Sequence, residues 1–225
     1  MSIATNGFVL AMSHRYLLAI CICALSVVFH KWAPFLGALG IAMVVVTNIE
    51  FSLVRNGGLV SPRPSKTDLL VFLLGCLAMV AIKVIGVFGL FTLDLPMIGE
   101  FKHYLIGQDQ YESLERVNGL TKAALLAVLV IVSEVVLGAT EDANLNKARS
   151  LRRKVLMFIL PLAAYPEIFS RVLVVYWVSE LIFIVSAFAT TQTRIRLSAA
   201  LIFCSYGVAP NALNVIIGPV SIFSF

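Results

Sequence analysis

The sequence predicts an all-α protein: a polytopic membrane bundle of six to seven transmembrane helices with an amphipathic helical segment on its outer side. Hydrophobic residues make up 60% of the 225 residues and charged residues only 13%. The mean hydropathy of +0.98 is far above that of a soluble domain. Several apolar runs approach or exceed the roughly 20 residues that cross a bilayer as a helix. Residues 1–225 are therefore expected to form a single transmembrane domain.

The expected spans follow one another along the whole chain. They are Tyr16–Phe29, Ala33–Val54, Leu69–Phe91, Leu120–Leu137, Val155–Ala164, Val172–Ala189 and Leu197–Ile217. The Val155–Ala164 run has only ten residues, so it crosses only if the basic residues before it reach toward the headgroups or the helix is broken. The last run is interrupted by Pro210 and Asn211.

The two longest polar segments between these spans are residues 92–119 and 138–154. Residues 92–119 carry apolar side chains at roughly helical spacing with charges between them, which predicts amphipathic helices on the membrane surface. Residues 138–154 are expected to be a basic cytoplasmic loop. With that loop inside, eleven of the seventeen lysines and arginines fall on the cytoplasmic side, as the positive-inside rule requires. The 92–119 segment and the stretch 165–171 then emerge on the outer face.

The distribution of charge and cysteine excludes some classes of function. The net charge of +5 follows the loops rather than one basic surface, so no nucleic-acid partner is expected. The four cysteines all lie inside apolar runs, where they are expected to pack as small hydrophobic residues and not to bind a metal. They are Cys21, Cys23, Cys76 and Cys204.

Arg171 is the first candidate for a functional side chain. It lies just inside a predicted helix and four residues after Glu167, so the two can form an ion pair on one helix face. That pair, with the guanidinium reaching to headgroups, is one interpretation. The other is a phosphate clamp, because a guanidinium binds two phosphate oxygens at once.

Polar residues elsewhere are further candidates. His30 can exchange a proton near neutral pH or can anchor its helix at the interface, and Lys31 beside it can face an anionic lipid. Tyr104, Tyr111 and Arg116 in the outer segment suit sugar binding or form a solvated face.

Two charges lie inside predicted spans. Lys83 is well inside its apolar run and Glu180 is near the middle of another. A charge at that depth requires a partner or water, so we expect a Lys83–Glu180 pair, either structural or lining a cavity. Glu134 is close to the cytoplasmic end of its span and is expected at the interface.

The order of short motifs resembles a known family. Phe29-His30-Lys31-Trp32-Ala33 comes first, then Tyr111-Glu112-Ser113, then a basic loop, then Pro166 to Leu173 with Tyr176. This order is similar to the C-terminal half of Wzy-like exopolysaccharide and O-antigen polymerases of the EpsG type. Family members have more spans, so the chain is expected to be a truncated member or a fragment of a longer one.

The resemblance implies a metal-independent glycosyltransferase of the bacterial inner membrane that needs no cofactor. Its substrate would be a polyprenyl-diphosphate-linked oligosaccharide, joined to the next repeat unit on the face toward the periplasm or exterior. Arg171 would bind the diphosphate and His30 would act as general base or as a second diphosphate contact. Lys31, Glu167, Arg116, Tyr104 and Tyr111 would contact substrate. The implied partners are membrane lipid and a chain-length regulator or partner membrane chain.

Two other functions remain open from the residues alone. Charges at mid-depth favour a flippase or transporter of a lipid-linked or amphiphilic substrate. The apolar stub before Arg15 and the short Val155–Ala164 run favour a non-catalytic membrane subunit.

Overall fold

The structure is a computed structural model. It describes residues 7, 10–25, 33–53, 65–87, 113–138, 140, 142–201 and 203–204. All regular secondary structure in these ranges is helical, which confirms the predicted all-α class. Four of the described helices are long and apolar enough to cross a membrane, which indicates a membrane protein.

The four spanning helices match apolar runs expected from the sequence. They are α3 (Ala33–Leu53), α4 (Lys66–Val87), α6 (Ser113–Leu137) and α8 (Pro166–Ala189). A shorter apolar helix, α2 (Tyr16–Leu25), precedes them. Helix α8 begins six residues before the apolar run it contains, because Pro166 occupies the first helical turn, where its missing N–H costs no hydrogen bond.

The segment expected to be a basic cytoplasmic loop is largely a helix. Helix α7 (Ala143–Ile159) covers most of residues 138–154 and continues directly into the 3-10 helix η4 (Leu160–Ala164). The loop prediction is therefore wrong for residues 143–154. The four basic residues that suggested a solvated loop are buried instead.

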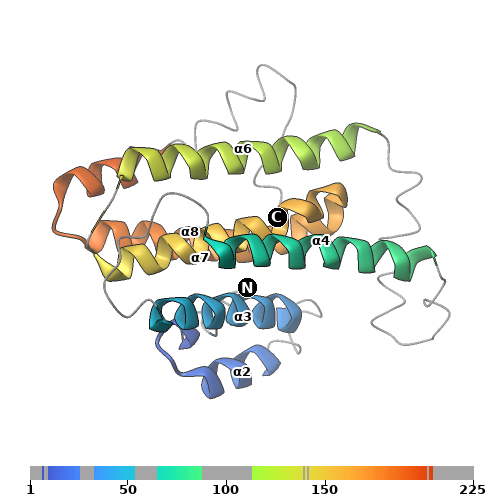
Figure 1. Ribbon diagram of the computed structural model, residues 1–225, viewed down its shortest axis with the longest axis horizontal. Helices are drawn as coiled ribbons and strands as arrows, with labels where there is room; N and C mark the ends of the chain where they lie inside the picture. The colour runs from blue at the N-terminus through green and yellow to red at the C-terminus, as the bar shows by residue number, and fades with distance from the viewer. Residues whose placement is uncertain are drawn as a thin grey trace.

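Helix α7 lies in the interior of the bundle. In Figure 1, α6 runs along one side of the molecule and α3 along the other, with α4, α7 and α8 between them. Helix α7 contacts all four spanning helices, and α2 packs against α3. The apolar side chains Leu145, Leu151 and Ile159 of α7 are fully buried. By contrast, α4 is peripheral and exposes a row of large apolar residues, as a lipid-facing helix does.

Helices α4 and α7 approach each other closely at one point. A Cβ atom placed on Gly75 would lie 2.4 Å from the backbone carbonyl oxygen of Phe158. No side chain longer than hydrogen fits there without a shift of the backbone. Close helix contact through a small residue is a common device of membrane proteins, because it maximises van der Waals contact where lipid competes for apolar surfaces.

Candidate functional site: a buried charge network around α7

Helix α7 begins at a strong cap just after α6 ends. The carboxylate of Asp142 accepts hydrogen bonds from the backbone N–H groups of Asn144, at 2.9 Å, and Leu145, at 3.0 Å. The amide of Asn146 donates to the carbonyl of Thr140 at 2.7 Å. Capping satisfies N–H groups that the first helical turn leaves unpaired. The cap therefore fixes the start of the helix immediately before its basic residues.

Eight charged side chains gather around the middle of α7, and we call them the charge network. The cations come from α7 and the carboxylates from four neighbouring helices. The members are Arg149, Arg152, Arg153 and Lys154 with Glu50, Asp68, Glu134 and Glu180. Four cations and four carboxylates give a net charge of 4 − 4 = 0. The most exposed of these side chains, that of Glu50, is 17% accessible.

One side of the charge network joins α7 to α6 and α8. Arg149 donates from Nε and Nη2 to one carboxylate oxygen of Glu134, at 2.9 Å and 2.6 Å. Arg152 lies between two carboxylates, with Nη2 at 2.7 Å from Glu134 and Nη1 at 3.2 Å from Glu180. The hydroxyl of Tyr176 donates to the other oxygen of Glu180 at 2.8 Å. Two carboxylates and two guanidinium groups thus form one continuous chain.

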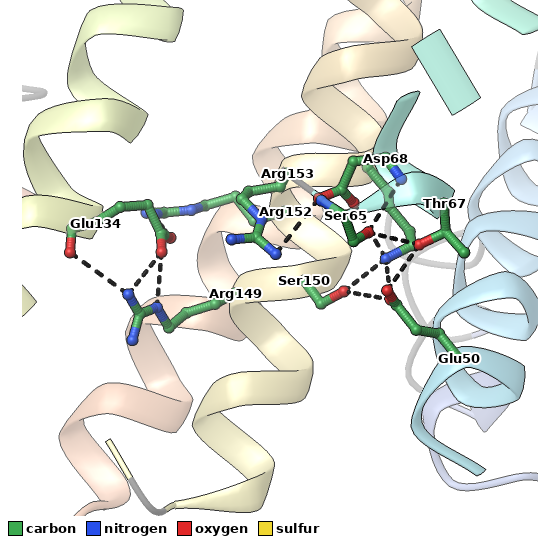
Figure 2. A network of polar contacts seen from close by, with 10 residues as sticks. Glu50, Ser65, Thr67, Asp68, Glu134, Arg149, Ser150, Arg152 and Arg153 are labelled. Carbon is green, nitrogen blue, oxygen red and sulfur yellow. Dashed lines mark hydrogen bonds and ion pairs between the residues drawn. The ribbon is translucent and has the colours of Figure 1, made fainter. Parts of the chain in front are cut away.

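The other side of the charge network joins α7 to α3 and α4. The ammonium of Lys154 bonds to a carboxylate oxygen of Glu50 and lies 3.2 Å from a carboxylate oxygen of Asp68. Arg153 reaches the second oxygen of Asp68 at 3.4 Å. Figure 2 shows both sides: Glu134 with Arg149 at one end, and the carboxylates of α3 and α4 at the other. Lys154 also donates to the hydroxyl of Ser150 at 2.6 Å.

Hydroxyl groups and an aromatic ring provide further partners for the charged groups, although Nε of Arg152 and Nε of Arg153 are buried without a hydrogen bond to the described part of the chain. Ser150 donates at 3.0 Å to the same oxygen of Glu50 that Lys154 contacts, and Thr67 donates at 2.7 Å to the other oxygen. Arg152 donates to the hydroxyl of Ser133 at 2.5 Å. The guanidinium carbon of Arg152 also lies 3.8 Å from the ring centre of Phe183, an attractive cation–π distance.

The pairing explains how α7 can carry four cations in the bundle interior. A lone arginine or lysine at the centre of a membrane helix costs roughly 2.5–3.5 kcal/mol, so four would cost roughly 10–14 kcal/mol. A buried charge is tolerated when it is paired and its remaining hydrogen-bonding groups are satisfied. The charge network joins five helices, and because its charges sum to zero it offers no net charge to a ligand.

The structure gives Glu180 a different partner from the one expected. Glu180 is 2% exposed and bonds to Arg152 and Tyr176. The side chain of Lys83 is exposed on α4, and no ion pair joins these two described residues. The predicted Lys83–Glu180 pair is therefore wrong. Glu134, expected at the interface, is buried at 5% exposure because two arginines of α7 neutralise it.

The residues proposed to contact substrate are placed only in part. Arg171 lies in the second turn of α8 and is half-buried. Glu167 and Arg116 lie on α8 and α6, but their side chains are outside the described part of the structure. His30, Lys31, Tyr104 and Tyr111 are outside the described residues altogether. Their convergence with Arg171 stays a prediction.

No metal site is found where the structure describes the chain. Within the ranges given above, no three His, Cys, Asp or Glu side chains gather in a way that could hold an ion. The four cysteines are free thiols, of which Cys23 is buried and Cys21 and Cys204 are exposed.

Comparison with known proteins gives no family for the chain. It matches no protein-family model, no curated protein and no solved structure at a significant level. The resemblance to Wzy-like polymerases is therefore supported by its short motifs alone.

Proposed function

We propose that α7 and η4 together form a further membrane crossing beside the four apolar helices. They contain 17 and 5 residues. At ~1.5 Å per residue for the α-helix and ~2.0 Å for the 3-10 helix, they extend about 35 Å, enough for a hydrocarbon core of roughly 30 Å. With one or both of the apolar segments Tyr16–Phe29 and Leu197–Ile217, the chain would cross six or seven times.

We propose that the protein acts in bacterial polysaccharide assembly. It would be a metal-independent glycosyltransferase that joins polyprenyl-diphosphate-linked oligosaccharide units on the outer face of the cytoplasmic membrane. The observation that carries this proposal is the position of Arg171, half-buried in the second turn of α8. At ~1.5 Å per residue it is about 14 Å along the helix axis from Glu180, the member of the charge network on the same helix.

The position suits the chemistry of a diphosphate leaving group. An acceptor hydroxyl attacks the anomeric carbon, the bond to the diphosphate oxygen breaks, and negative charge grows on that oxygen. A guanidinium in a partly dry site stabilises this charge more than one in water. The first turn of α8 adds unpaired N–H groups and the positive end of a helix dipole. In this proposal His30 takes the proton from the attacking hydroxyl.

The test is the replacement of Arg171 by alanine and by lysine. The purified protein is placed in liposomes with a polyprenyl-diphosphate-linked repeat unit, and product length is measured on gels. Loss of a group that stabilises transition-state charge lowers rates by about 100-fold or more. Arg171→Ala should therefore abolish long products, and Arg171→Lys should retain part of the activity. Lys83→Ala is the matched control, because it removes an exposed cation from α4. Normal product ladders in Arg171→Ala would contradict the assignment.

The charge network favours a second candidate, a carrier of a lipid-linked or amphiphilic substrate. Charged groups inside a helix bundle commonly mark substrate or ion pathways. In the same liposomes, a carrier would speed the movement of a fluorescent polyprenyl diphosphate between leaflets and would form no longer products.

A further inference from the structure

Four of the five basic residues of α7 lie in its middle and make this helix a poor candidate for entering a membrane alone. Arg149, Arg152, Arg153 and Lys154 occupy its middle, and each is strongly disfavoured in hydrocarbon unless it is neutralised. All four are buried in the finished bundle. Their partners must therefore be present when the helix enters, or α7 must wait at the membrane surface.

The partners are divided unequally along the chain. Glu50, Asp68 and Glu134 belong to α3, α4 and α6, which precede α7 in synthesis. The fourth carboxylate, Glu180, belongs to α8 and pairs with Arg152. Before α8 is made, four cations thus face three carboxylates. The charges balance only when Glu180 arrives.

The connection between α7 and α8 suits entry of the two helices as a unit. Helix η4 leads through Tyr165 directly to Pro166 at the start of α8. The backbone N–H of Tyr165 donates to the carbonyl of Leu162 at 2.8 Å, and that of Phe169 donates to the carbonyl of Tyr165 at 2.9 Å. The two helices pack together along their lengths. A short hydrogen-bonded turn of this kind keeps antiparallel helices adjacent.

We propose that α7 and α8 enter the membrane together as a helical hairpin, after α3, α4 and α6, and that Glu180 is the group that permits this step. The proposal rests on the crossing by α7 proposed above and is independent of the reaction catalysed. Without Glu180, the carboxylate that still pairs with Arg152 among the described residues is Glu134, which Arg149 already neutralises. The hairpin then carries one unbalanced cation, and α7 stays on the side where it was made.

The test determines on which side of the membrane residue 164 is accessible. Ala164 is exposed at the end of η4, so Ala164→Cys provides a site for a membrane-impermeant maleimide. The four natural cysteines are replaced by alanine, and newly made full-length chains are pulse-labelled from outside. Position 164 should be labelled from outside in the parent chain and in a chain with Lys83→Met. It should lose most of that labelling in Glu180→Gln.

A charge-balanced variant separates this mechanism from general misfolding. Arg152→Met with Glu180→Gln removes one cation and one carboxylate and should restore outside labelling at position 164. Full labelling in Glu180→Gln alone, or no recovery in the double variant, would overturn the proposal. If position 164 of the parent chain is never labelled from outside, the crossing by α7 itself is refuted, whatever the variants show. Polymerase activity has no bearing on either result.

Discussion

Replacement of Arg152 is the most informative test of the charge network. Arg152→Met keeps a long side chain of similar reach but removes the cation that links Glu134 to Glu180. The charge network then carries 3 − 4 = −1. Glu134 retains Arg149 as a partner, so the unbalanced charge falls on Glu180, whose remaining partner within the described part of the chain is the hydroxyl of Tyr176.

The size of the effect follows from burial. Arg152 is fully buried and Glu180 is 2% exposed, so solvent cannot replace the lost partner. Breaking a buried ion pair by removing one member costs about 3–5 kcal/mol. For a chain of this size, 1 kcal/mol corresponds to roughly 2–4 °C in the unfolding midpoint, so we expect a decrease of roughly 6–20 °C. The lost contact with Phe183 adds to the cost.

The assay is thermal unfolding of the purified protein in detergent micelles. Arg152→Met and Glu180→Gln are measured singly and together, with Lys83→Met as the control. The double variant returns the net charge of the network to 3 − 3 = 0, and it should recover most of the loss. Losses that simply add in the double variant would refute the pairing.

Two further changes test the packing and the start of α7. Gly75→Ala would place a Cβ 2.4 Å from the carbonyl oxygen of Phe158. Because a backbone atom cannot rotate away, we expect the free energy of unfolding to fall by about 1–3 kcal/mol. The same thermal assay measures this loss. An unchanged midpoint would show that the helices do not meet there. Asp142→Ala removes two hydrogen bonds that cap α7 and should cost about 0.5–2 kcal/mol, whereas Asp142→Asn should retain most of the stability. Equal loss in both variants would argue against the cap.

Four spanning helices could be predicted because each contains a nearly continuous apolar run. Lipid-facing helices such as α4 carry this signal strongly, since their outward side chains are apolar as well. Helix α7 could not be found in this way. Helix α7 is surrounded by other helices, so it does not need to be apolar on every face. Its middle is basic, and its local hydropathy therefore resembles that of a loop.

The candidate site was predictable only in part for the same reason. The sequence indicated that Glu180 needs a partner at depth, and that is correct. The sequence favours Lys83 as that partner, because local hydropathy places the cations of residues 149–154 in a loop. One signal could have corrected this: four cations cluster at residues 149–154, and four carboxylates lie within or beside apolar runs, namely Glu50, Asp68, Glu134 and Glu180. The sequence places Arg171 near the start of a helix, because a short polar stretch separates the apolar runs Val155–Ala164 and Val172–Ala189.

The central claim is that α7, with four buried cations, crosses the membrane, and the two ends of the α7–η4 segment test this claim most directly. Asn144 and Ala164 are exposed and lie near the start of α7 and at the end of η4. Asn144→Cys and Ala164→Cys are introduced separately into the cysteine-free chain and labelled from each side with an impermeant maleimide. The proposed crossing, oriented by the positive-inside rule, predicts that position 144 reacts from the cytoplasmic side and position 164 from the opposite side. Reaction of both positions from the same side would contradict the account.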